Sequence, residues 1–115
     1  MNGYNQKVVC AWFAEQGIPQ PEFEYQFCER KWKFDIAWEF VNKGALFRRL
    51  VPFALAIEVQ GGIWVHGRHN RGAALKKEWE KLNTAASMGW RILYCEPRDL
   101  CTTDFAETIK LALNI

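Results

Sequence analysis

The chain has 115 residues, of which 50% are apolar and 15% aromatic, and its formal net charge is +2. This composition excludes a disordered chain, and a core of this size needs no disulfide or metal to support it. The weak positive charge permits a nucleic-acid partner but excludes a histone-like density of basic residues. The cysteines form no C-x-x-C pair, and no apolar run reaches the roughly 18 residues of a membrane span. We therefore expect residues 1–115 to form one cytoplasmic domain.

The first third of the chain predicts one helix and two strands. Residues 5–16 carry apolar side chains at helical spacing and stop at Gly17. Residues 22–27 alternate aromatic and polar side chains, and residues 31–40 continue the same period of two, which indicates two half-buried strands. The apolar side of the second strand is predicted to hold Trp32, Phe34, Ile36, Trp38 and Phe40.

A third strand, residues 53–60, precedes the segment GGIWVHGRHNRG, residues 61–72, whose four glycines predict a loop. Residues 73–88 then repeat apolar side chains at helical spacing, residues 90–95 read as a strand, and residues 103–114 as a closing helix. The core-facing side of the middle helix is predicted to consist of Leu75, Trp79, Leu82 and Ala86.

This order of elements predicts an α/β fold. Three consecutive strands favour an antiparallel meander, and the strand-helix-strand passage that follows favours one parallel pair. The expected sheet is therefore mixed and four-stranded, in αβββαβ order, with helices flanking it.

Three polar side chains interrupt this pattern at two neighbouring strands. Asp35 lies on the polar side of the second strand, and Glu58 and Gln60 share the polar side of the third. Because consecutive strands are often neighbours, we expect Asp35 and Glu58 to converge. Small alanines on the same side suggest a partly covered face, where two carboxylates would attract Mg²⁺ or Mn²⁺. A solvent-exposed strand face is the alternative explanation for these acids.

With Asp35 in FDIA and Glu58 in EVQ, the chain resembles the PD-(D/E)XK nuclease superfamily. The sequences of residues 30–40, 55–72 and 80–94 are similar to those of small phage-type members of this superfamily. These members include virus-type replication-repair nucleases and very-short-patch-repair-like endonucleases. The resemblance implies a restriction-endonuclease-like core and a Mg²⁺-dependent or Mn²⁺-dependent DNA endonuclease. Asp35 and Glu58 would then be the catalytic metal ligands.

The resemblance departs from its usual pattern at Gln60, which stands where a lysine is expected and cannot carry a positive charge. A glutamine can still orient a water molecule. We expect Lys77 or Lys81 on the following helix to supply the missing charge and to contact DNA.

The loop 61–72 provides the other candidate contacts. His66 and His69, with Arg68 and Arg71, suit phosphate binding or proton transfer, and Trp64 suits stacking on a base. Zinc binding by the two histidines and a solvated loop are the alternatives. Further candidates for a metal carboxylate are Glu15, Glu24 and Glu80.

The sequence thus favours a metal-dependent endodeoxyribonuclease acting on branched or mismatched DNA, which we expect to be a homodimer. The alternatives are a catalytically inactive DNA-binding module of the same fold and a protein-interaction domain without a nucleic-acid role.

Overall fold

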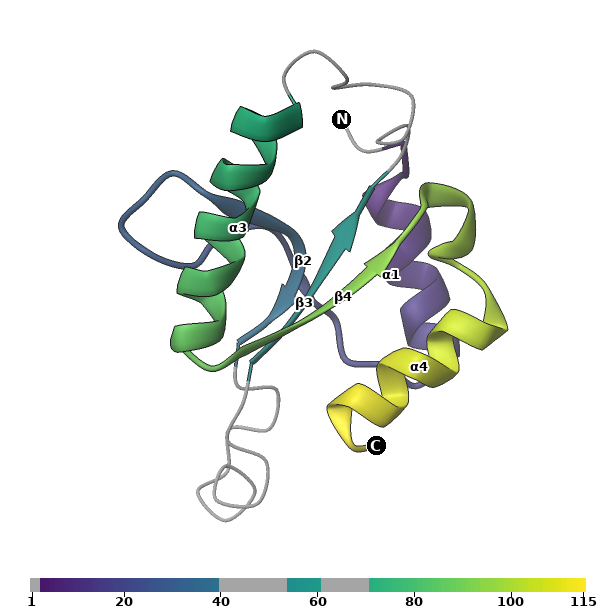
Figure 1. The fold of residues 1–115 in the computed structure, drawn as a ribbon. Helices are drawn as coiled ribbons and strands as arrows, with labels where there is room; N and C mark the ends of the chain where they lie inside the picture. The colour runs from purple at the N-terminus through teal and green to yellow at the C-terminus, as the bar shows by residue number, and fades with distance from the viewer. Residues whose placement is uncertain (1–2, 40–53, 61–70) are drawn as a thin grey trace.

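The computed structural model describes residues 3–39, 54–60 and 71–115 (Figure 1). Along the chain, its elements are α1 (Gln6–Glu15), β1 (Glu22–Gln26), β2 (Lys33–Trp38), β3 (Ala54–Val59), α3 (Arg71–Ser87), β4 (Trp90–Cys95), the 3-10 turn η1 (Pro97–Asp99) and α4 (Thr103–Leu113). Asn5 caps α1, because its side-chain oxygen accepts from the backbone N–H groups of Lys7 and Val8.

The four strands form one mixed sheet in the order β1-β2-β3-β4. β1 pairs with β2 and β2 with β3 in antiparallel fashion, whereas β3 and β4 are parallel. The predicted α/β class, with its meander and one parallel pair, is therefore confirmed. None of the helices in the described ranges is long and apolar enough to cross a membrane.

The sheet separates two cores. α1 and α4 cover one face, where Phe13 and Ile109 pack with Leu55 and Ile57 of β3 (Figure 1). α3 covers the other face, where Ala85 packs in a cluster with the small residues of β3 and with aromatic side chains of β1, β2 and β4. These small residues are Ala54 and Ala56, which alternate with Leu55 and Ile57 as a strand requires.

The alternation of β2 breaks at Asp35. Phe34 packs in the core on the α3 side, whereas Ile36 packs in the core on the α1 and α4 side. The predicted single apolar face of this strand is therefore wrong. The register pairs Phe23 with Ile36 and Tyr25 with Phe34, so Glu24 lies opposite Asp35. Glu24 has a positive φ of 50°, which marks the irregularity on the neighbouring strand.

The predicted core side of α3 is also wrong. Leu75 and Trp79 are 40% and 55% exposed, and Ala86 is also exposed. The preceding residue, Ala85, is fully buried. α3 also begins at Arg71, so the predicted loop ends two residues earlier than expected. The helix is rotated so that its small Ala85 meets the sheet.

This rotation predicts opposite effects for two adjacent substitutions. We expect Ala85→Leu to destabilise the fold by about 1–3 kcal/mol, because three more carbon atoms must enter a filled core. Ala86→Leu, the matched control, is expected to change stability by less than about 0.5 kcal/mol, because its side chain is exposed. Urea unfolding of both variants measures the difference, and the reverse ranking would mean that α3 packs through the side predicted from the sequence.

Candidate functional site

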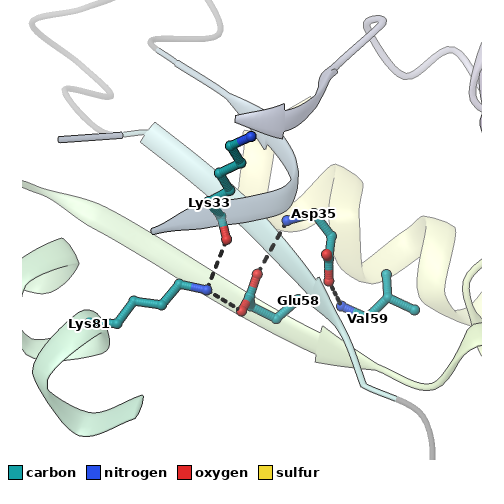
Figure 2. A network of polar contacts seen from close by, with 5 residues as sticks. All are labelled: Lys33, Asp35, Glu58, Val59 and Lys81. Carbon is teal, nitrogen blue, oxygen red and sulfur yellow. Dashed lines mark hydrogen bonds and ion pairs between the residues drawn. The ribbon is translucent and has the colours of Figure 1, made fainter. Parts of the chain in front are cut away.

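The two acids do converge, across the pair β2 and β3. The backbone N–H of Asp35 donates to Oε2 of Glu58 at 3.2 Å, and Oδ2 of Asp35 accepts from the backbone N–H of Val59 at 2.7 Å (Figure 2). The regular register of these strands runs from Trp38 to Ile36, so the reciprocal bonds begin one residue beyond it. Side-chain oxygens therefore continue the connection between the strands where the backbone ladder stops.

The carboxylate of Glu58 is buried and paired with a lysine of α3. Nζ of Lys81 lies 2.7 Å from Oε1 of Glu58, and the two side chains are only 12% and 8% exposed. The same ammonium donates to the carbonyl oxygen of Lys33 at 2.9 Å, whose own side chain points away from the site (Figure 2). Glu58 is thus held by one cation and one backbone N–H, and α3 is tied to both central strands.

Burial raises the pKa of the Glu58 carboxyl, and the negative charge of Asp35 raises it further. The hydrogen bond and the charge of Lys81, together with the Asp35 N–H, lower the pKa of Glu58 but do not cancel the effect of burial. The charged form of Glu58 is therefore disfavoured in this site, although the ammonium of Lys81 lies 2.7 Å away.

The donor set suits a hard divalent cation. Mg²⁺ and Mn²⁺ prefer carboxylate oxygens, and two adjacent acids on rigid strands are a common arrangement for them. An ionised carboxylate offers about four lone-pair sites. Within the described ranges two donors to Glu58 are seen, so its oxygens retain acceptor capacity. A cation there would also offset the repulsion that raises the pKa of Glu58.

Gln60 follows β3 directly and is partly buried. Its backbone N–H donates to the carbonyl oxygen of Cys95 at 2.8 Å, so the chain is still held to β4 there. Of the two lysines expected to supply charge, Lys81 reaches Glu58, whereas Lys77 is exposed one turn earlier on α3. The Cys95 thiol is an unsuitable nucleophile, because burial and the charges of Asp99 and Asp35 raise its pKa to about 12.

The structure does not describe most of the predicted loop contacts. Trp64, His66, Arg68 and His69 are outside the described residues, and Arg71 is the first residue of α3.

The three additional acids lie in different places. Glu15 is exposed on α1, across the sheet from Glu58, and Glu24 is exposed on β1 opposite Asp35. Glu80 turns to Arg30, with 3.2 Å between the carboxylate and the guanidinium. Across the parts of the chain that the structure describes, no three or more His, Cys, Asp or Glu side chains group to hold a metal.

Sequence reasoning missed the loop between β1 and β2. Arg30 lies over the ring of Trp32, with 4.0 Å from its guanidinium carbon to the ring centroid, and reaches α3 through Glu80. The available signal was the basic cluster Arg30, Lys31 and Lys33 around a tryptophan, between two predicted strands.

No protein-family model, curated protein or solved structure matches the chain. The features that bear on function are therefore the positions of Asp35, Glu58 and Lys81.

The buried ion pair gives a pH-dependent stability prediction. We expect Lys81→Met to destabilise the fold by about 3–5 kcal/mol at pH 8, because Glu58 is then buried without its cation. Lys81 lowers the pKa of Glu58, so its removal raises that pKa further. For an acid whose folded pKa is raised, stability is fully present below the unfolded pKa and is lost as the pH rises through the folded pKa. The stability lost through Lys81→Met should therefore be smaller at pH 5 than at pH 8.

Urea unfolding at pH 5 and pH 8 measures this difference. Lys110→Met is the matched control, because Lys110 pairs at 3.6 Å with the exposed Glu107 and its loss should be about 0–1 kcal/mol at either pH. Equal losses for Lys81→Met at both pH values would contradict the assignment of Glu58 as the buried partner.

Proposed function

We propose that this protein is a metal-dependent endodeoxyribonuclease with a restriction-endonuclease-like core, related to the PD-(D/E)XK superfamily. The observation that carries the proposal is the contact between Asp35 and Glu58 on adjacent strands, with the ammonium of Lys81 at 2.7 Å from Glu58. Two acids and one cation on rigid elements are the minimal set for phosphodiester hydrolysis in this superfamily. The mixed sheet, with helices on both faces, supports the same assignment.

Asp35 and Glu58 would hold Mg²⁺ or Mn²⁺. When bound, such an ion lowers the pKa of water and stabilises the negative charge that develops on a phosphate. The chain's own contribution is orientation. Val59 fixes the carboxylate of Asp35, and the N–H of Asp35 fixes that of Glu58, so the two acids keep one mutual geometry without rearrangement.

Lys81 supplies the positive charge that the resemblance expects at Gln60. Its ammonium projects from α3 toward Glu58 and is also anchored by the carbonyl of Lys33. A fixed cation beside the acids stabilises charge on a phosphate oxygen more than a mobile one in water does. Gln60 then orients water through its amide, and Lys77 contacts the DNA backbone.

The same ion pair favours a second candidate, a catalytically inactive DNA-binding module of this fold. An ammonium at 2.7 Å neutralises Glu58 without any metal, which is how a site that has lost its ion would keep the carboxylate buried. The two candidates differ in whether the protein cleaves DNA when a divalent cation is present.

Cleavage of DNA distinguishes them. Purified protein with Mg²⁺ or Mn²⁺ is expected to nick branched or mismatched DNA, and Asp35→Asn to reduce the rate by at least about 10²-fold, because the amide cannot serve as an anionic ligand. Asparagine can still accept from the Val59 N–H, so the fold should survive, which circular dichroism checks. Asp104→Asn, at an exposed position of α4, is the matched control. Wild-type protein that binds these DNAs with either metal but never cuts them would support the inactive module instead.

The two lysines of α3 give a second test. We expect Lys81→Gln to lower the cleavage rate by about 10²-fold, whereas Lys77→Gln should mainly weaken DNA binding, because only Lys81 contacts Glu58. Rates at saturating DNA, below the unfolding temperature of each variant, separate the two effects. Equal rates for Lys81→Gln and wild type would remove Lys81 from the catalytic set.

A further inference from the structure

The loop between β1 and β2 has a fixed conformation. Nε2 of Gln26 donates to the carbonyl oxygens of Cys28 and Arg30, at 3.1 and 2.8 Å. One amide therefore bridges both sides of the loop, and the loop emerges on the α3 side of the sheet (Figure 1). A loop closed in this way presents its basic side chains in a defined position.

Ring contacts connect Arg30 to Lys81. The guanidinium lies over Trp32, and the Trp32 ring stacks on Phe27 with centroids 6.3 Å apart and planes inclined by 18°. Phe27 stacks on Phe34 at 4.2 Å and 11°, and Nζ of Lys81 is 5.4 Å from the Phe34 centroid. A cation thus lies at each end of this series of rings, so the surface arginine is positioned relative to the buried lysine.

The partner of Arg30 is weakly held. Nη1 of Arg30 is 3.2 Å from Oε2 of Glu80, and the two side chains are 56% and 54% exposed. An ion pair with this exposure contributes little to stability, because water screens it. A guanidinium has five N–H donors in a planar fork that suits a phosphate, and this contact uses one nitrogen.

Two further lysines lie near Arg30 in the chain. Lys31 and Lys33 are exposed on the same loop and strand, and the acids beside Arg30 are Glu29 and Glu80. The backbone carbonyl of Lys33 accepts from Lys81, so the end of this loop lies next to the Glu58 site, although the Lys33 side chain points away from it (Figure 2). Closely spaced lysines and arginines of this kind attract the phosphate backbone of nucleic acids.

We propose that Arg30 binds a phosphate of the DNA strand that enters the Asp35 and Glu58 site, and that Glu80 stays paired with Arg30 until this phosphate displaces Glu80. This inference rests on the proposed function for the site that the strand enters. Trp32 keeps the guanidinium over its ring, so that the nitrogen now bonded to Glu80 turns to the phosphate without moving the loop. Glu80 and the DNA phosphate therefore compete for the guanidinium of Arg30.

The test measures binding without cleavage. Fluorescence anisotropy of a labelled branched DNA is recorded in EDTA over a range of salt concentrations. We expect Arg30→Gln to weaken binding about five- to tenfold at low salt and to reduce the salt slope by roughly one, because one phosphate contact is lost. The affinity of Arg30→Lys should fall between those of wild type and Arg30→Gln, because lysine retains the charge without the planar fork.

Glu80→Gln is the informative variant, since it is expected to tighten binding about two- to fivefold by releasing Arg30. Glu107→Gln is the matched control, because it breaks the exposed pair with Lys110 and removes the same charge away from the site. In the double variant Arg30→Gln with Glu80→Gln, the gain should disappear. A variant that simply unfolds cannot bind more tightly, so the gain separates the proposal from a loss of structure.

The outcomes also separate this inference from the proposed nuclease activity. Unchanged affinity for Arg30→Gln and for Glu80→Gln, in a protein that cuts DNA, would overturn the role of Arg30 alone. Binding that depends on Arg30, in a protein that never cuts, would overturn the nuclease and leave Arg30 as a DNA contact. A gain for Glu80→Gln no larger than that for Glu107→Gln, or one that persists without Arg30, would reduce the effect to general charge and overturn the competition. Wild-type protein that binds no DNA in EDTA at any salt concentration would overturn the role of Arg30, and one that also never cuts DNA with metal would overturn both.

Discussion

The buried pair of Glu58 and Lys81 determines how the α3 side of the molecule is built. A carboxylate inside an alanine-lined sheet face is costly unless a cation reaches it, and Lys81 is the residue that does. Lys81 and Ala85 lie one turn apart on the same side of α3, so the side of the helix that carries the ion pair is also the side that packs on the sheet. Leu75 and Trp79 lie off this side and are exposed, against the apolar pattern of the helix.

The site and the sheet share the same hydrogen bonds. Where the regular pairing of β2 and β3 stops, Asp35 and Glu58 exchange bonds with the backbone of the opposite strand. The shift in alternation at Asp35 places Phe34 on the α3 side, where it lies beneath Lys81. The irregularity of β2 thus serves the candidate site, since a strictly alternating strand would put Phe34 and Ile36 on one face.

Most elements could be predicted from the sequence because their signals are local. Period-two runs and helix stops gave the strands and helices to within a few residues, and the adjacency of consecutive strands was enough to bring Asp35 near Glu58. Which of Lys77 and Lys81 contacts Glu58 could not be predicted, because the two lysines lie one turn apart on the same helix. Arg30 was missed because its position depends on Gln26, Trp32 and Glu80, which are contacts between segments rather than a motif.

The charge balance of the site connects the two proposals. Two carboxylates at one site disfavour the approach of a phosphate, and the negative charge of Asp35 already raises the pKa of Glu58. In the proposed nuclease a divalent cation would offset this repulsion, so DNA would approach the acids more readily when metal is present. The loop of Arg30 does not depend on metal, because its charge comes from side chains alone. In the proposed function, capture of DNA by the loop and metal-dependent engagement by the acids would therefore be separable steps, and the rings that run from Arg30 to Lys81 connect the two places.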